Sequence, residues 1–221
     1  YEYVDLGRLF QFALLVGLIL WVFLVARALW PALRQRNAQR PLLILLLIPT
    51  VATGGFYFAA LGAARHTNLA IAEYWRWWVV HLWVEGFFEV FATAALALIF
   101  ARMGLVKASH AGAAVIGSSA LFLFSGIPGT FHHLYFSGTP TSIMAVGASF
   151  SALEVVPLVL IGFEAYQTSR MHAAATWMRR YRWPVTFFVG VAFWNLVGAG
   201  LFGFLINPPI ALYYMQGLNT T

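Results

Sequence analysis

The chain has 221 residues, of which 62% are hydrophobic and 9% are charged, and its formal net charge is +6. Soluble domains carry about 25% charged residues, so this composition excludes a water-soluble domain and requires lipid to cover the apolar surface. Cysteine is absent, which excludes disulfides and thiolate metal sites. The basic residues fall in short segments between apolar runs, which indicates membrane topology and not nucleic-acid binding.

Six apolar runs are each long enough to cross a bilayer as a helix, which takes about 20 residues. In chain order they are residues 9–30, 41–64, 75–101, 113–135, 142–166 and 184–206. A seventh run begins at Pro209. The runs are continuous and do not alternate, so we expect helices and not the strands of a barrel. The sequence predicts an all-α, polytopic transmembrane helical bundle, with one domain over residues 1–221 that is a segment of a longer chain.

Lysine and arginine residues are divided unevenly between the two sides of this predicted bundle. Ten of them lie in or near the first, third and fifth connections: Arg27, Arg34, Arg36, Arg40, Arg102, Lys107, Arg170, Arg179, Arg180 and Arg182. Only Arg8, Arg65 and Arg76 lie on the opposite side. Because positive loops stay cytoplasmic, we expect an inner-membrane protein whose N-terminus in this segment is periplasmic.

The third apolar run contains ionisable residues, which are costly inside a membrane and mark functional sites. His81, Glu85 and Glu89 recur every four residues, so they share one face of a helix. This run enters from the periplasmic side. At about 1.5 Å per residue, His81 lies roughly 9 Å and Glu85 roughly 15 Å past Trp75.

Two adjacent histidines, His132 and His133, stand near the periplasmic end of the fourth run. They therefore share the predicted depth of His81. Neighbouring residues on an ideal helix point about 100° apart, so both rings would not normally face one target. Residues 126–129 read Gly-Ile-Pro-Gly, which can bend or unwind the helix and let both rings turn toward the same point.

The fifth run adds Glu154, about 12 residues past its start, at the depth of Glu85. Three imidazoles with a carboxylate at one level suit iron, copper or zinc, so the sequence predicts a metal site. For Glu89 and Glu154 two interpretations stay open, a proton path or hydrogen-bonded packing. A transporter or proton channel that uses these residues without redox chemistry is the alternative from another functional class.

The remaining histidines, His66, His110 and His172, are predicted to lie in solvated loops. Glu164 lies close to the inner interface, where we expect a structural role.

Three stretches resemble the catalytic subunit of bacterial nitric oxide reductase, a family within the haem-copper oxidase superfamily. Residues 73–86 read EYWRWWVVHLWVEG, residues 129–136 read GTFHHLYF, and residues 151–154 read SALE. The resemblance covers essentially the whole chain and implies that the helices form part of a haem-copper-oxidase-like bundle.

The resemblance also implies a role for each matching residue. The ligands of a non-haem iron would be His81, His132, His133 and Glu85. Glu89 and Glu154 match family glutamates near that iron, where they would supply protons or tune the metal. The implied reaction joins two nitric oxide molecules with two electrons and two protons to give nitrous oxide and water.

Oxygen-reducing relatives are the main alternative within the superfamily. Many of them carry His-x-x-x-Tyr, where this sequence has His81-x-x-x-Glu85. A hard anionic oxygen ligand suits iron better than copper, which favours nitric oxide reduction. Residues 131–136 and 3–30 resemble the single-chain, quinol-dependent branch of the family, so quinol is the expected electron donor.

The family's haem ligands have no counterpart in this sequence. One family haem histidine lies on an early helix, and two follow a stretch like residues 213–221. We therefore expect the ligands of haem b and haem b3 in the remaining segments of the catalytic chain, and no turnover from this segment alone.

Overall fold

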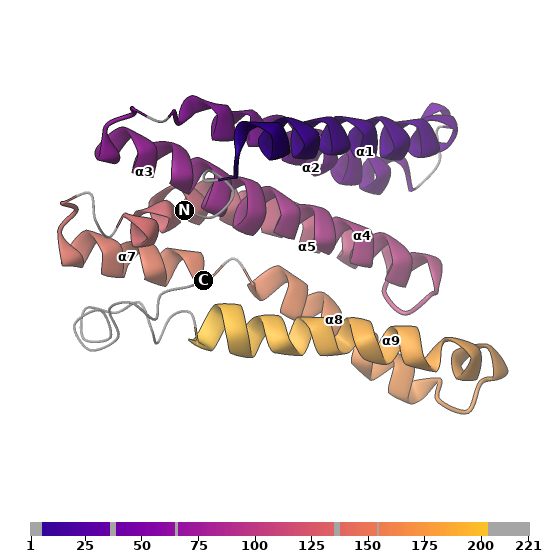
Figure 1. Cartoon of the computed structure of the whole chain (residues 1–221). Helices are drawn as coiled ribbons and strands as arrows, with labels where there is room; N and C mark the ends of the chain where they lie inside the picture. The colour runs from indigo at the N-terminus through magenta and orange to yellow at the C-terminus, as the bar shows by residue number, and fades with distance from the viewer. Residues whose placement is uncertain (1–5, 36–38, 65, 135–137, 154, 203–221) are drawn as a thin grey trace.

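The computed structural model describes residues 6–35, 39–64, 66–134, 138–153 and 155–202. Within these residues all regular secondary structure is helical, as predicted for the all-α class. The long helices lie side by side with their axes roughly aligned (Figure 1). The α1–α2, α4–α5 and α8–α9 connections share one end of the bundle, at the right of the view.

The helices change winding several times along the chain. The α-helices are α1 (Arg8–Arg34), α2 (Arg40–Phe56), α3 (Leu69–Trp77), α4 (Glu89–Arg102), α5 (Ala108–Leu121), α6 (Ile127–Gly129), α7 (Thr141–Ser151), α8 (Val156–Met171) and α9 (Thr176–Trp194). The 3₁₀ segments are η1 (Tyr57–Gly62) and η4 (Thr130–His133). The π-helical segments are η2 (Trp78–Phe88), η3 (Phe122–Gly126) and η5 (Asn195–Phe202).

Five helical stretches in the described part of the chain are long and apolar enough to cross a membrane. They are Arg8–Arg34, Arg40–Gly62, Leu69–Arg102, Ala108–His133 and Thr141–Met171, which correspond to the first five predicted runs. The sixth predicted run is helical as far as Phe202 in η5 but is not among these five. Its last residues, and the predicted seventh run from Pro209, lie outside the described residues.

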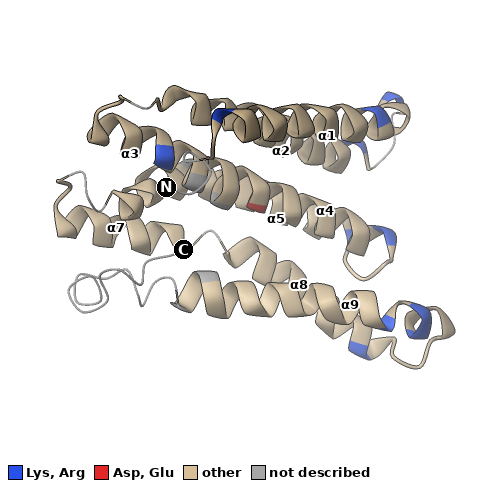
Figure 2. Ribbon diagram, in the orientation of Figure 1, with Lys and Arg blue, Asp and Glu red and all other residues tan. Residues whose placement is uncertain are grey.

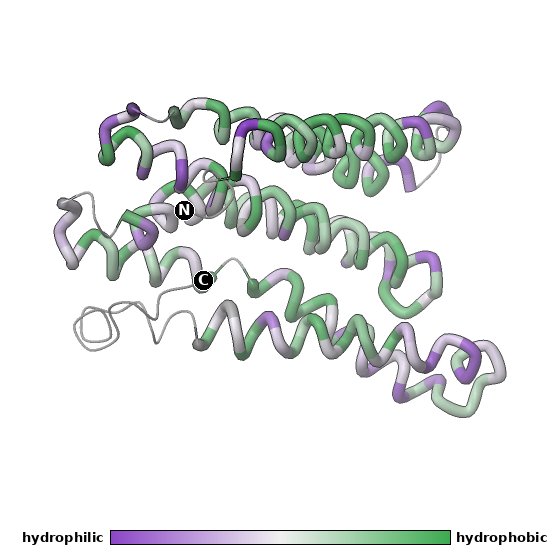
Figure 3. Tube along the Cα trace, in the orientation of Figure 1, coloured by the Kyte–Doolittle hydropathy of each residue, from purple (hydrophilic) through white to green (hydrophobic). Residues whose placement is uncertain are grey.

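Small residues bring the helices of the core close together. Ala94 and Ala97 of α4, Ala111 of α5 and Ala165 of α8 are fully buried in the largest hydrophobic cluster. Close backbone approach through small side chains is typical of membrane bundles, where lipid removes the hydrophobic drive for association. Apolar side chains also cover the outer faces of the helices, and the hydrophilic residues concentrate toward the helix ends (Figure 3).

The basic residues gather at one end of the bundle. Figure 2 shows most lysine and arginine residues of the described chain at the end that carries the α1–α2, α4–α5 and α8–α9 connections. The uneven division expected from the sequence is therefore present in three dimensions. Which side of the membrane this end faces stays a prediction.

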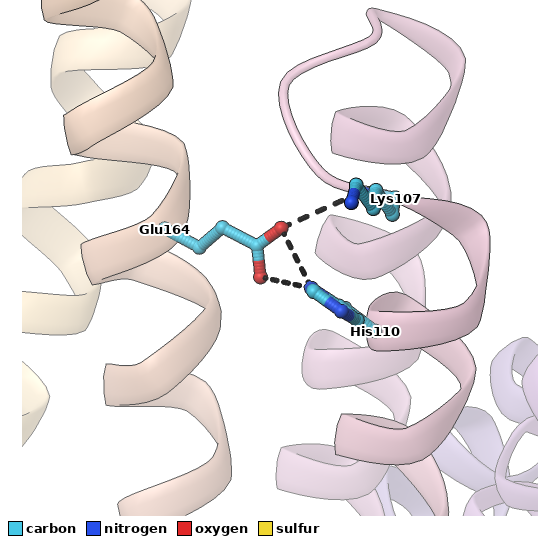
Figure 4. Close-up of polar contacts among 3 residues, drawn as sticks. All are labelled: Lys107, His110 and Glu164. Atoms are coloured by element: carbon cyan, nitrogen blue, oxygen red, sulfur yellow. Dashed lines mark hydrogen bonds and ion pairs between the residues drawn. The ribbon is translucent and has the colours of Figure 1, made fainter.

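His110 was predicted in a loop, and this was wrong. It lies in the first turn of α5, with Nδ1 3.1 Å from each carboxylate oxygen of Glu164 on α8 (Figure 4). The backbone N–H of Lys107 donates to the same carboxylate over 3.5 Å. The helix begins before the apolar run because its first turn lies beyond the hydrocarbon, where polar side chains are tolerated. His66 lies in a turn and His172 at the C-terminal cap of α8, so neither lies within a helix.

Candidate metal centre

Three histidines from two distant parts of the chain meet inside the bundle. His81 comes from η2, and His132 and His133 come from η4. One ligand nitrogen from each ring lies within 4.8 Å of the other two. The centroid of the His81 ring is 5.4 Å from that of His132 and 5.3 Å from that of His133. All three are buried, His81 completely.

The helix that carries His81 is wound as a π-helix around this residue. Such segments bond N–H to the carbonyl five residues back, and they occur frequently at functional sites. Gly86 lies in the same segment, and a Cβ there would overlap the ring of Phe122 in η3. The two π-helical segments therefore contact each other directly, which places the His81-bearing segment against the helix that leads to the other two histidines.

The histidine pair owes its arrangement to a tightening of the helix that carries it. The chain passes from π winding in η3 through a short α6 to 3₁₀ winding in η4. The hydroxyl of Thr130 donates to the carbonyl oxygens of Gly126, over 3.2 Å, and Ile127. The rings of His132 and His133 lie 4.1 Å apart at their centroids. The local change of winding expected from the Gly-Ile-Pro-Gly segment is thus present.

Helix α7 packs closely against the backbone of this histidine pair at Gly147. A Cβ on Gly147 would lie 2.8 Å from the backbone nitrogen of His132 and 3.0 Å from the carbonyl oxygen of Pro128. Only a hydrogen atom fits in that space. Backbone atoms cannot swing aside as a side chain does, so the contact fixes the distance between α7 and η4.

Helix α3 contacts the same segment through an arginine for which the sequence pattern predicted only a topological role. Nη1 of Arg76 lies 3.4 Å from Oε2 of Glu73 and donates to the backbone carbonyl of His133 over 3.5 Å. Glu73 is 1% exposed. The signal in the sequence is an acid three residues before an arginine, just ahead of His81.

The structure describes only one of the three predicted carboxylate side chains, that of Glu89. Glu89 begins α4 and is partly buried, with Oε1 shielded from solvent, but it is not a member of the three-histidine group. The four-residue spacing assumed α-helical winding, and the π winding of η2 alters the angle between His81 and Glu89. The side chain of Glu85 and the whole of Glu154 lie outside the described residues.

The three imidazoles form a donor set that fits one metal ion. Metal–imidazole bonds of about 2.0–2.1 Å keep two ligand nitrogens no more than about 4.2 Å apart. Nitrogens within 4.8 Å of one another therefore need to approach by at most about 0.6 Å to meet this limit. Imidazole sets of this kind suit iron, copper or zinc.

Comparison with known proteins identifies the class to which this arrangement belongs. Residues 1–221 match the family described as "Cytochrome C and Quinol oxidase polypeptide I". The chain therefore belongs to this family of haem-copper oxidases, which are multi-pass membrane oxidoreductases that use haem and metal cofactors.

A curated relative gives a narrower similarity. Over 161 residues the chain is 32% identical to a nitric oxide reductase subunit of Stutzerimonas stutzeri, and the match covers 70% of this chain and 32% of the relative. The matched part is thus about a third of that relative's length.

Proposed function

We propose that this chain is the metal-bearing segment of a nitric oxide reductase. The enzyme would convert two nitric oxide molecules, two electrons and two protons into nitrous oxide and water. The observation that carries the proposal is the convergence of three buried histidines in a haem-copper oxidase chain. The similarity to a nitric oxide reductase subunit and the glutamate four residues after His81 support it.

In this proposal His81, His132 and His133 hold a non-haem iron, with Glu85 as an additional ligand. When bound, iron supplies a redox-active Lewis acid that binds nitric oxide and polarises it. Metal ligation requires neutral imidazoles. The contacts of Gly147 and Arg76 with the His132–His133 segment hold the rings in place before the metal arrives.

The two protons of the reaction have to reach a site enclosed by apolar helices. We assign this role to Glu89 and Glu154, which would hold protons close to the iron or adjust its charge. Glu89 supports the assignment because it is partly buried within a span-length helix, where a carboxylate is costly unless it is used.

The remaining parts of the machinery are proposed to lie elsewhere in the catalytic chain. Haem b and haem b3 would be held by ligands outside this segment, and quinol would donate the electrons. The enzyme would sit in the bacterial inner membrane with the basic end of the bundle in the cytoplasm and the N-terminus of this segment on the periplasmic side. The gathering of basic residues at one end supports this orientation (Figure 2).

The identity of the metal tests the proposal. Anomalous scattering at the iron, copper and zinc edges, measured on the complete protein as purified, should give iron at the three histidines. His132→Ala should remove that signal, and His110→Ala, a histidine at the opposite end of the fourth span, should keep it. Copper at the site would replace the proposal with an oxygen-reducing enzyme. A purified complex without haem that conducts ions in liposomes would replace it with an ion-translocating protein.

A further inference from the structure

A hollow with a volume of about 470 Å³ lies between the last turn of α1 and the first turns of α2. It lies at the end of the bundle that carries the α1–α2 connection and most of the basic residues (Figures 1 and 2). Its lining combines two arginines with apolar side chains: Trp30, Leu33, Arg34, Arg40, Ile44 and Leu47.

The two arginines bring positive charge to this hollow without a carboxylate to balance it. The described part of the chain shows no ion pair for Arg34 or Arg40. Nε of Arg40 is buried without a hydrogen-bond partner in the described structure. Two guanidinium groups that line one hollow repel each other, so an anion between them would be stabilised.

The guanidinium of Arg34 is held in a defined place. Its Cζ lies 5.2 Å from the centroid of the Trp30 ring, a cation–π contact. Tryptophan is typical of the membrane–water interface, where one edge is wet and the ring is in lipid. The charged side of the hollow therefore lies at headgroup depth.

The other side of the hollow is apolar and partly exposed in the described structure. Leu33, Ile44 and Leu47 form this side, and Ile44 is 41% exposed. A small inorganic anion would use the arginines and leave the aliphatic side uncovered. A ligand that satisfies both sides has an anionic head and a hydrocarbon tail.

We propose that this hollow binds one anionic phospholipid, with its phosphate between Arg34 and Arg40 and an acyl chain along Leu33, Ile44 and Leu47. Guanidinium groups recognise phosphate through paired hydrogen bonds, and basic pockets between transmembrane helices bind anionic headgroups. The bound lipid would join α1 to α2 at the basic end. The site is independent of the metal centre and of the reaction proposed for it.

The test uses the complete protein in nanodiscs and native mass spectrometry, with phosphatidylglycerol and phosphatidylcholine as probes. The wild type should retain phosphatidylglycerol in preference to phosphatidylcholine. Arg34→Gln with Arg40→Gln should weaken phosphatidylglycerol retention about tenfold or more. Arg179→Gln with Arg180→Gln removes the same charge from exposed positions of α9 and should leave retention unchanged.

Conservative variants distinguish a loss of lipid binding from misfolding of the protein. Arg34→Lys with Arg40→Lys keeps the charge and should keep the preference for phosphatidylglycerol. Equal retention of the two lipids by the wild type would overturn the proposal, as would equal loss in both glutamine pairs. Density for another protein segment in the hollow, in a structure of the complete enzyme in phosphatidylglycerol nanodiscs, would also overturn it.

Discussion

Adding a single methyl group next to the backbone of the histidine pair should disrupt the metal centre without replacing any ligand. In Gly147→Ala the new Cβ would start 2.8 Å from the backbone nitrogen of His132 and 3.1 Å from the carbonyl oxygen of Gly129. Ordinary contact begins at 3.4 Å, so α7 and η4 must separate by about 0.6 Å at the closest pair (3.4 minus 2.8). Both partners are backbone, so the whole segment has to move.

Two consequences follow from this displacement. Overpacking of a well-packed core costs about 1–3 kcal/mol of stability. The shift also moves the ring of His132 relative to His81, and changes in the supports of metal ligands typically cost about 10–100-fold in metal affinity or activity. We expect Gly147→Ala to lower iron occupancy and turnover by at least about tenfold, with a smaller loss of thermal stability.

The measurement compares iron per protein, the spectroscopic signal of the non-haem iron and nitric oxide consumption in the complete enzyme. Gly117→Ala is the matched control, because this glycine lies in α5 of the same span as the histidine pair and has open space around it. It should keep the wild-type iron content. If Gly147→Ala retained full iron occupancy and turnover, the contact between α7 and η4 would have no role in positioning His132.

Substitutions at three further positions test other parts of the centre. Arg76→Gln removes the hydrogen bond to the carbonyl of His133, so iron affinity should fall about tenfold, measured by iron retention during chelator titration. Arg76→Lys should restore part of it, and equal losses in both variants would indicate a purely structural role. Glu85→Ala should retain haem but lose most nitric oxide turnover, and wild-type turnover would remove Glu85 from the active site. Glu154→Gln should slow proton-dependent steps more than nitric oxide binding, whereas a turnover rate unchanged at every pH would favour packing.

The winding of the helices is the main difference between expectation and structure. Periodicity of apolar and polar residues predicts a helix, but it does not distinguish α, π and 3₁₀ winding over a few residues. In η2 the choice depends on how the helix packs, including the contact of Gly86 with Phe122. The consequence is functional, because the angle between His81 and Glu89 follows from the winding and not from the spacing alone.

Because the protein is expected to span a bilayer, part of its structure can be predicted from its sequence. The thickness of the hydrocarbon sets the length of each apolar run, and these runs located the first five spans. Most of the helices extend beyond the runs, where polar residues enter the interface. The distribution of basic residues located the end of the bundle where they gather. Together these features predicted a common depth for His81, His132 and His133, without any information about their contacts.

The contacts within that layer were decided by tertiary structure. The predicted depth of a residue is its position along the membrane normal. It does not determine the orientation of the side-chain ring or the residues that pack against it. The convergence of His132 with its neighbour depends on 3₁₀ winding. The support from Gly147 and Arg76 comes from two other helices, α7 and α3. These contacts arise from close packing between helices. They cannot be predicted from one segment alone, because the position of each side chain depends on the backbone of the neighbouring helix.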